Sequence, residues 1–291
     1  MALDSSPSPS PLDTRRLAEA VADIEIRPLT SLAEFTACVA LQKDVWGANF
    51  EDVIPTALLQ VVSHIGGIIA GAFTADGELI GFVFGLNGSR NGQTIHWSHA
   101  LGVRESARNA GVGRMLKEHQ RAELARRGIS TLYWTFDPLM AKNAHLNLNR
   151  LGARVIEYVE NMYGTTGSPL HHGLATDRLV VSWSTASQPV RHPEASARAA
   201  PPEGHPILTP QPRTGDVVAR IDAPARPATL WLEVPPDIQR ESPATVALWH
   251  AATRMHLEWA LHDGYAATAL YRDPLTSRSF YVLERNAATP A

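Results

Sequence analysis

Hydrophobic residues in the first half of the chain recur at alternate positions or in short unbroken runs, which is typical of β-strands. Residues 24–28 alternate and end at a proline, which predicts an edge strand. Two runs rich in Ile, Val and Phe, at 67–74 and 78–86, are separated by a short Ala-Asp-Gly segment, which predicts a β-hairpin. Further strands are predicted at 94–103, 131–136, 154–158 and 178–183.

Helix-like spacing of hydrophobic residues interrupts these strands. Ser31 can cap the first helix, because Glu34 stands at the capping-box position. A second helix follows Pro55. The later helices, with the glycines suited to end them in a left-handed conformation, are 115–125 with Gly128 and 143–151 with Gly152. Intermixed strands and helices predict an α/β or α+β fold, in which helices cover a sheet.

The pattern changes near both the start and the middle of the chain. Residues 1–22 are rich in Ser and Pro and are predicted to be a disordered tail. Residues 185–215 are dominated by Pro, Ala, Ser and Arg and are predicted to be a linker. The part between them, 23–184, is the predicted catalytic domain. Beyond the linker, residues 216–286 form a predicted C-terminal subdomain with strands at 216–221 and 229–234, a helix at 246–261, and strands at 265–271 and 279–283, in β-β-α-β-β order.

Composition limits the classes of partner and compartment. The net charge of -3 gives no overall basic field, so a nucleic-acid partner is not expected. The single cysteine, Cys38, excludes an intrachain disulfide, and its apolar neighbours favour a buried residue over a reactive thiol. No apolar run approaches the roughly 20 residues that a membrane span needs, and the first residues lack the basic and apolar regions of a secretion signal. We therefore expect a cytoplasmic protein without a membrane partner.

The most informative segment runs from His99 to Gly113, where a predicted strand enters a glycine-containing turn and then a helix. Gly111 and Gly113 permit conformations and close approaches that a Cβ would obstruct. Unpaired N–H groups at the start of the helix converge where the helix dipole is positive, which favours an anion such as a pyrophosphate. The segment lacks the Gly-Lys-Ser/Thr end of a Walker loop and the spacing of a dinucleotide fingerprint. Taken alone, it is equally compatible with a tight turn that binds nothing.

The wider context resembles a known family. Leu-x-Val at 101–103, followed by Arg-x-x-Gly-x-Gly at 108–113, resembles motif A of the GNAT acyltransferases. Residues 134–139 and 143–152 resemble the strand and helix of the family's motif B. Residues 161–164 and 173–178 are similar to an uncharacterised bacterial GNAT group, some of whose members occur beside amino-acid racemases. The resemblance implies a GNAT-type mixed sheet, splayed and flanked by helices.

That resemblance also implies a co-substrate, acetyl-CoA or another acyl-CoA. Backbone groups of Leu101 and Val103 would pair with the pantetheine, the turn would hold the pyrophosphate, and Asn143 matches the family asparagine near the thioester. The family's usual tyrosine, four residues before the helix-ending glycine, is replaced by Leu148. The residues expected to bind the co-substrate are Leu101, Val103, Arg108, Asn109, Ala110, Gly111, Val112, Gly113, Arg114 and Asn143.

Two residues are candidates for proton transfer. His99 stands where some amine-acetylating GNAT enzymes carry a histidine in the same His-Ala-Leu-x-Val frame, and a histidine with a pKa near its ordinary ~6.5 can accept the proton of an amine. A strand histidine hydrogen-bonded in the core is the equally weighted alternative. Tyr163 is the candidate acid for the departing thiolate, with Tyr133 and Asp137 as further options. The adjacent His171 and His172 do not face one site, so we predict no metal.

Together these features predict an N-acyltransferase that moves an acyl group, acetyl or succinyl, from CoA to a primary amine. A small amine or an amino acid is the favoured acceptor. Two alternatives stay open: acetylation of a protein lysine or N-terminus, and a non-catalytic module that binds acyl-CoA. The role of residues 216–286 is also open between a separate domain, a lid and a homodimer surface.

Overall fold

A computed structural model describes residues 23–48, 50, 52–164, 174–186, 207–208 and 227–285. The chain divides into two compact units, residues 1–130 and residues 131–291. Each unit has its own strands and helices.

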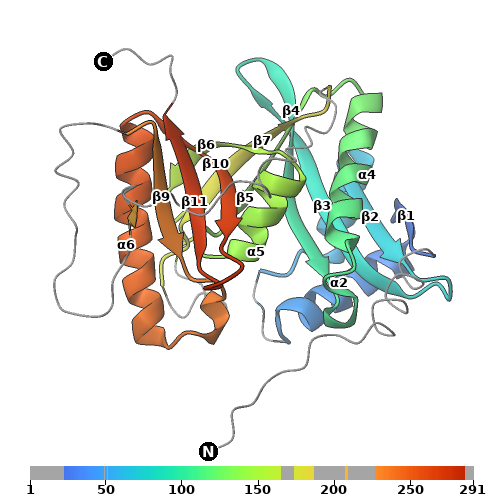
Figure 1. Ribbon diagram of the computed structural model, residues 1–291. Coiled ribbons are helices and arrows are strands. Elements are labelled where there is room, and N and C mark those ends of the chain that lie inside the picture. The colour runs from blue at the N-terminus through green and yellow to red at the C-terminus, as the bar shows by residue number, and fades with distance from the viewer. Residues whose placement is uncertain are drawn as a thin grey trace, which may run out of the picture. The chain divides into compact units, whose positions relative to one another are not determined.

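The first unit is built on an antiparallel sheet in the order β1-β2-β3-β4 (Figure 1). Its strands are β1 (Glu25–Pro28), β2 (Ile68–Phe73), β3 (Leu79–Arg90) and β4 (Gln93–Val103). The predicted hairpin joins β2 to β3 through Gly77. Its φ is 82°, a left-handed conformation that glycine adopts without steric strain. A second hairpin joins β3 to β4 through Asn91 and Gly92, with φ of 51° and 74°. This second hairpin extends β3 beyond the predicted end at residue 86.

Helices cover both faces of this sheet. They are α2 (Leu32–Trp46), α3 (Thr56–His64) and α4 (Val112–Arg126), with a short 3-10 turn, η1 (Glu105–Ala107). The predicted capping box is present, because the Ser31 side chain accepts from the Glu34 N–H and the Glu34 side chain accepts from the Ser31 N–H. Beyond α4, Gly128 has φ of 72°, and the Ile129 N–H donates to the Leu124 carbonyl at 3.0 Å. This is the left-handed helix end that the sequence predicts.

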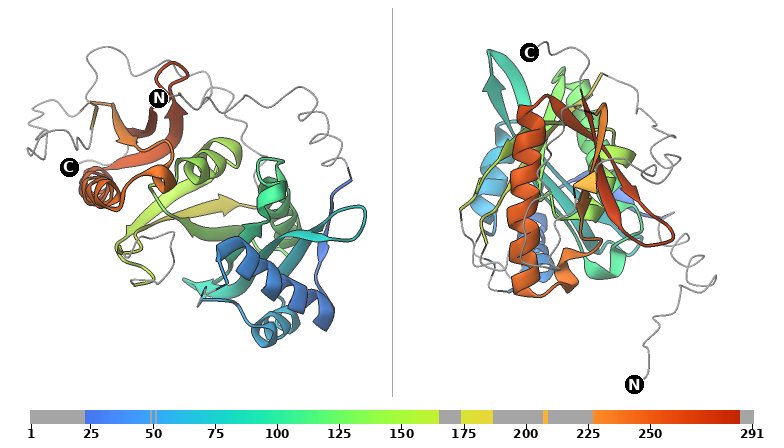
Figure 2. Two further views of the ribbon diagram at one scale, coloured as in Figure 1. Left: turned by 90° about the horizontal axis from the view of Figure 1, so that it is seen from below. Right: turned by 60° about the vertical axis from the view of Figure 1, so that its left-hand side comes forward.

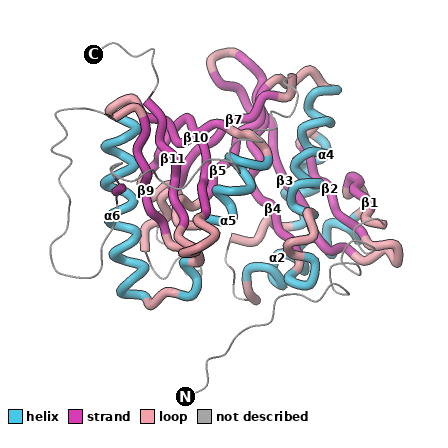
Figure 3. The backbone as a smooth tube through the Cα atoms, in the orientation of Figure 1, coloured by secondary structure: helices cyan, strands magenta, loops and turns pink. Residues whose placement is uncertain are grey.

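Two hydrophobic cores hold together the sheet and the helices, whose backbone is drawn in Figure 3. On one face of the sheet, side chains of α2 and α3 pack against Phe82 and Phe84 of β3. Cys38 lies in this core with 0% exposure, and burial raises the pKa of its thiol to about 12, so the expectation of an unreactive buried cysteine is confirmed. On the other face, Leu116 of α4 packs against Val83. Strand β4 is thus fixed by its pairing with β3, and the turn that follows it leads into the packed helix α4.

The second unit contains two sheets. The first has the antiparallel order β5-β7-β6, formed by β5 (Thr131–Phe136), β6 (Arg154–Val159) and β7 (Arg178–Ser184). The second has the order β10-β11-β9-β8, formed by β8 (Ile207–Leu208), β9 (Thr229–Val234), β10 (Tyr265–Arg272) and β11 (Ser279–Arg285). Strand β8 is parallel to β9, and the other pairs of this sheet are antiparallel.

Helical segments join and cover the strands of the second unit. They are α5 (Ala141–Ala144), the π-helical η2 (His145–Arg150), the 3-10 turn η5 (Ile238–Arg240) and α6 (Pro243–His262). Figure 2 shows α6 running beside strands of the second sheet. The buried Asn149 fixes η2 to β10, because its side chain donates to the Leu270 carbonyl at 2.7 Å and accepts from the Leu270 N–H at 2.9 Å. Gly152 then ends the helical segment with φ of 69°.

The predicted mixture of strands and helices, with mostly antiparallel sheets flanked by helices, is confirmed. The predicted elements at 229–234, 246–261, 265–271 and 279–283 correspond to β9, α6, β10 and β11. The predicted tail 1–22 and the strand predicted at 216–221 lie outside the described residues. Strand β8 lies inside the predicted linker, most of which is also outside them. The boundaries 23–184, 185–215 and 216–286 stay predictions. Within the described part of the chain, no helix is long and apolar enough to cross a membrane.

Candidate active site

The segment between β4 and α4 forms a tight turn with two left-handed residues. Asn109 has φ of 66° and Gly111 has φ of 81°. Gly111 is also the residue that precedes α4, and a Cβ placed on it would meet nothing within 4 Å. The turn therefore needs glycine at 111 for its backbone conformation, not for lack of space inside the protein.

Backbone N–H groups in this turn are left without protein acceptors. Among the described residues, none accepts a hydrogen bond from the N–H groups of 109–114, and the first paired N–H of the helix is that of Met115, which donates to the Gly111 carbonyl at 3.0 Å. The N-terminal end of a helix also carries a partial positive charge. The geometry therefore provides several oriented donors for an anion.

The side chains of the turn leave this end of α4 uncrowded. Arg108 is exposed and its Nε donates back to the Val103 carbonyl at 3.3 Å, while the Arg114 Nε donates to Glu118 at 2.8 Å. Val112 is 1% exposed and points into the core that α4 makes with the sheet. Ala110 packs against the same core. Of these residues, Val112 and Ala110 can therefore offer a ligand mainly their backbones.

Gly113 differs from Gly111. It has no positive φ, and a Cβ on it would lie 3.5 Å from a methyl group of Leu101, which is ordinary contact. Gly113 therefore adopts no conformation that requires glycine, because it already lies in the first turn of α4, and the close approach of a ligand to it stays a prediction. A side chain at this position would start toward Leu101 and Val103 of β4.

His99 occupies an irregular position in β4. The register of β4 against β3 shifts between the pair Phe84 and Ala100 and the pair Gly85 and Ser98, which leaves His99 as the extra residue of a β-bulge. Its side chain is exposed, and its ring meets the edge of the Phe84 ring with centroids 6.1 Å apart. Burial of part of the ring lowers the pKa of His99 below its ordinary value, although Asp52 opposes that shift. His99 is therefore neutral at pH 7 and able to accept a proton, and its hydrogen-bonding nitrogens are not committed to the core.

A polar network lies beneath β4 that sequence reasoning largely missed. His96 is fully buried, with Nδ1 2.7 Å from the Asn87 Oδ1 and Nε2 3.0 Å from the Gln120 Nε2. Lys117 of α4 is also buried and donates to the Ser98 hydroxyl at 2.7 Å. His96 is therefore a hydrogen-bonded residue of the core. The one sequence feature connected with this network is the glycine at position 85. A side chain there would collide with His96, because its Cβ would lie 2.2 Å from the His96 Nε2.

This network predicts acid sensitivity. Burial, together with the charges of Lys117 and Arg127, lowers the pKa of His96 to about 3, so the unfolded state binds the proton more tightly between that value and ~6.5. Stability should therefore fall as pH drops below 6.5, by roughly 1 kcal/mol between pH 6.5 and 5.5 from this residue. Urea unfolding at pH 6.5 and 5.5 measures the free energy of unfolding. In His96→Gln, its decrease between these two pH values should be smaller by the contribution of His96. An unchanged decrease in that variant would contradict the assignment.

Residues of the second unit complete the predicted set. Asn143 is exposed on α5. Leu148 is 1% exposed within η2, so the position that corresponds to the family tyrosine is part of the core. Tyr163 is 43% exposed, and its hydroxyl lies 3.2 Å from that of Thr135. The guanidinium of Arg178 lies over the Tyr163 ring, 5.5 Å from its centroid.

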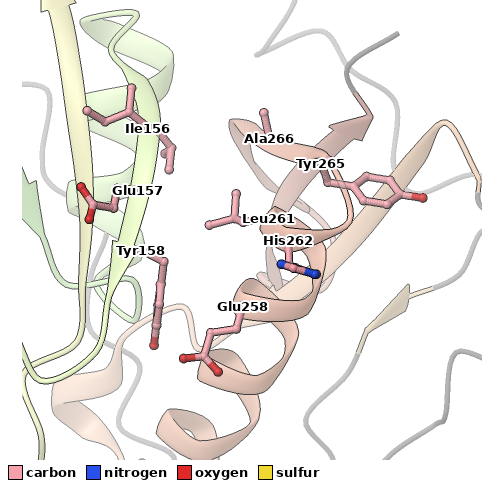
Figure 4. Close-up of a pocket in the computed structure, with 10 residues that line it drawn as sticks. Ile156, Glu157, Tyr158, Glu258, Leu261, His262, Tyr265 and Ala266 are labelled. Carbon is pink, nitrogen blue, oxygen red and sulfur yellow. The ribbon is translucent and has the colours of Figure 1, made fainter. Parts of the chain in front are cut away.

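A pocket that was not predicted lies in the second unit between β6, α6 and the start of β10 (Figure 4). Its volume is about 520 Å³. Tyr158 and Glu258 stand on facing walls, and none of the predicted binding or catalytic residues lines it. Elsewhere in the described residues, no group of three or more His, Cys, Asp and Glu side chains could hold a metal ion.

Comparisons with known proteins agree with the first unit's features. Residues 13–139 match the model of a protein family described as the acetyltransferase (GNAT) domain. No curated protein matches the chain.

Solved structures similar to the chain include several acetyltransferases. The ribosomal-protein-S18-alanine N-acetyltransferase from Escherichia coli is 18% identical and has a TM-score of 0.43, over 57% of this chain and 96% of that one. A GNAT-family acetyltransferase from Streptococcus pneumoniae is 16% identical, with a TM-score of 0.45 over 55% and 99%. Arabidopsis thaliana NAA60 in complex with acetyl-CoA is likewise 16% identical, with a TM-score of 0.45 over 55% and 99%.

Because the identities and TM-scores are low, the three structures do not indicate the substrates of this chain. The family match covers the bulged strand β4, the turn with its unpaired N–H groups and the whole of α4. The chain therefore resembles the acetyltransferase (GNAT) domain over residues 13–139.

Proposed function

We propose that the protein transfers an acyl group from acyl-CoA to a primary amine, and that the acceptor is a small amine or an amino acid. The observation that carries the proposal is the turn at 109–114, whose unpaired N–H groups stand at the start of α4 within residues that match the GNAT domain. Such a turn suits the pyrophosphate of CoA. The acyl group is acetyl in the simplest case, and succinyl is an alternative.

The remaining contacts with acyl-CoA follow from the resemblance to the family. Backbone groups of Leu101 and Val103 pair with the amides of the pantetheine. The N–H groups of 109–114, with Arg108 at the edge of the turn, bind the phosphates. Asn143 stands near the thioester. The exposure of Asn143 and the uncrowded end of α4 support these assignments.

In the proposed reaction, the nitrogen of a neutral amine attacks the thioester carbon, a C–N bond forms and the C–S bond breaks. His99 accepts the proton that the nitrogen loses, either directly or through a water molecule. Its exposure and its lowered pKa support this role, because the ring is unprotonated at neutral pH. A backbone N–H near Val103 stabilises the oxyanion of the tetrahedral intermediate. Holding both substrates together supplies much of the acceleration.

The departing thiolate takes up a proton, and we assign its donor as Tyr163. The exposed Tyr163 hydroxyl and the burial of Leu148 together support this assignment, since Leu148 has no proton to give. The neighbouring hydroxyl of Thr135 orients the phenol. A CoA thiolate is also stable enough in water to leave without a protein acid, so Tyr163 is expected to matter less than His99.

A second candidate function is a non-catalytic module that binds acyl-CoA. The buried Leu148 at the position of the family tyrosine favours it. This module would be stabilised by CoA against thermal unfolding but would release no thiol with any amine. The two functions are therefore separated by turnover and not by binding.

The acceptor class is tested by comparing free amines with peptides. We expect kcat/KM for at least one small amine or amino acid to exceed that for peptides with the same terminal residue by roughly 10-fold, because a site built for a small acceptor gains nothing from a chain that it cannot contact. Thiol release from acetyl-CoA measures both. Faster transfer to peptide N-termini or lysines would instead assign the protein to protein acetylation.

A further inference from the structure

An ion pair in the second unit links α6 to the segment before β7. The Asp177 side chain is 3% exposed, and Arg254 of α6 donates to both of its oxygens, from Nε at 2.8 Å and from Nη2 at 2.6 Å. A bidentate pair of this kind fixes both orientation and distance. Because Asp177 is buried, removal of Arg254 would take away the main counterion of its carboxylate.

Three further groups surround the same carboxylate. The Tyr158 hydroxyl donates to Oδ2 at 2.5 Å, the Asn161 N–H donates to Oδ1 at 3.0 Å, and the His250 Nε2 lies 3.3 Å from Oδ2. Burial alone would raise the pKa of Asp177, but the hydrogen bonds from Arg254, Tyr158 and Asn161 outweigh it and hold the pKa below its usual value. Asp177 therefore stays ionised at neutral pH and continues to accept the hydrogen bond from the Asn161 N–H.

Asn161 begins the turn that carries Tyr163. Two residues of this turn have positive φ, 45° at Asn161 and 73° at Gly164. Thr176, the neighbour of Asp177, accepts from the Tyr163 N–H at 2.9 Å and donates its hydroxyl hydrogen to the Gly164 carbonyl at 2.9 Å. The side chains of Thr176 and Asp177 thus hold both ends of the turn, and Arg254 holds Asp177.

We propose that Arg254 is a positioning residue for Tyr163, acting through Asp177. This inference rests on the proposed function, in which Tyr163 protonates the thiolate. The chain of contacts runs from the guanidinium of Arg254 to the carboxylate of Asp177, then to the Asn161 N–H and the turn. It gives α6 a role in the reaction although α6 contributes no reacting group.

The surroundings of Arg254 add a second acidic contact. Its Nη1 lies 3.4 Å from Glu160, which is also hydrogen-bonded to Glu258 on the wall of the pocket in Figure 4. That hydrogen bond, with some burial, raises the pKa of Glu258 to about 7. Glu258 is therefore partly protonated at neutral pH, while Arg254 keeps its bidentate pair with Asp177.

The experiment compares Arg254→Met and Arg254→Lys with a matched control in the full chain. Arg278, the residue before β11, makes a similar bidentate pair with Glu233 of β9, at 2.7 and 2.6 Å. Neither residue of this pair is hydrogen-bonded to the turn that carries Tyr163. Arg278→Met therefore removes a similar ion pair without touching Tyr163. Two readouts are recorded for each protein: kcat and KM with acetyl-CoA, and the ¹⁹F signal of 3-fluorotyrosine at position 163, assigned by its loss in Tyr163→Phe.

We expect Arg254→Met to lower kcat by roughly 10-fold with little change in the KM for acetyl-CoA, and to shift or broaden the Tyr163 signal. Arg254→Lys should restore part of both, and Arg278→Met should change neither. Should Arg254→Met fail to fold, Arg254→Lys alone is expected to show a smaller change in the same two readouts. A Tyr163 signal that is unchanged in a folded Arg254 variant would overturn the inference.

The failure of this inference differs from failure of the proposed function. A wild-type protein with no acyl transfer would refute the proposed function, and the ¹⁹F signal would still decide whether Arg254 orders Tyr163. Wild-type turnover in Tyr163→Phe would refute the catalytic role of Tyr163, and with it the role assigned to Arg254.

Discussion

Replacing His99 by alanine is expected to lower the rate of acyl transfer by about 10²-fold or more, which is the low end of what a general base contributes. The bulge in β4 presents the His99 side chain at the surface, where it can reach an amine, while its neighbours in the strand remain paired with β3. Binding of CoA should be unchanged, because the turn at 109–114 does not depend on this side chain. Steady-state kinetics and CoA titration measure the two effects separately.

The pH profile distinguishes the base from a merely structural histidine. Because the pKa of His99 is lowered, the wild-type activity should fall on the acid side with an apparent pKa below the ordinary 6.5, as the ring becomes protonated. His99→Ala should lose that limb along with most of its rate. The exposed His64, on α3 of the same unit, offers a control, and His64→Ala should keep both rate and profile. Turnover that is unchanged in His99→Ala would return His99 to a structural role.

Replacing Gly111 by valine is expected to weaken CoA binding by about 30-fold. A β-branched residue with φ near 81° is strained by ~1–3 kcal/mol, and the turn can relieve that strain only by leaving the left-handed conformation. That change would turn the N–H groups of 111–113 away from a common point, so the loss of binding should be of similar size, since 1.4 kcal/mol is about tenfold. Calorimetric titration of CoA measures it.

Gly77 provides a closely matched control for this substitution. Its φ is 82°, and a Cβ on it, as on Gly111, would meet nothing within 4 Å. Gly77→Val should therefore cost a similar amount of stability in thermal unfolding but leave the CoA affinity unchanged. Equal losses of affinity in the two variants, or none in Gly111→Val, would show that the turn does not hold the pyrophosphate.

Local sequence signals predicted those parts of the fold that depend on a few neighbouring residues. Ser31 and Glu34 form their capping box, and Gly128 ends α4, because each feature is decided within one helical turn. The second hairpin was missed although Asn91-Gly92 is a strong turn signal, since the polar residues before it obscured the strand pattern.

Features that depend on register or long-range packing could not be predicted in the same way. The bulge at His99 exists only in the pairing of β4 with β3. The left-handed conformation of residue 109 was not expected, because the residue there is an asparagine and not a glycine. Lys117 looks like a solvated helix residue in the sequence, yet the sheet covers it completely. The pair of Asp177 and Arg254 joins residues that are 77 positions apart, so no local pattern marks it.

The candidate site was predicted through its backbone more than through its side chains. The strand, turn and helix around Gly111 are present as expected, and the family match covers them. The outcome for Gly113 shows the limit of the motif, because one of its two glycines is not needed for the backbone conformation. The acid could not be inferred from the helix, since the corresponding position holds the buried Leu148.

The central claim is that this protein transfers acyl groups from CoA to amines, and amine-dependent thiol release from acetyl-CoA by the full chain tests it most directly. Across a panel of small amines and amino acids, we expect at least one acceptor to give saturable thiol release together with a stoichiometric amount of N-acetylated product. A protein that CoA stabilises against thermal unfolding, but that releases no thiol with any amine or peptide in the panel, would contradict the claim.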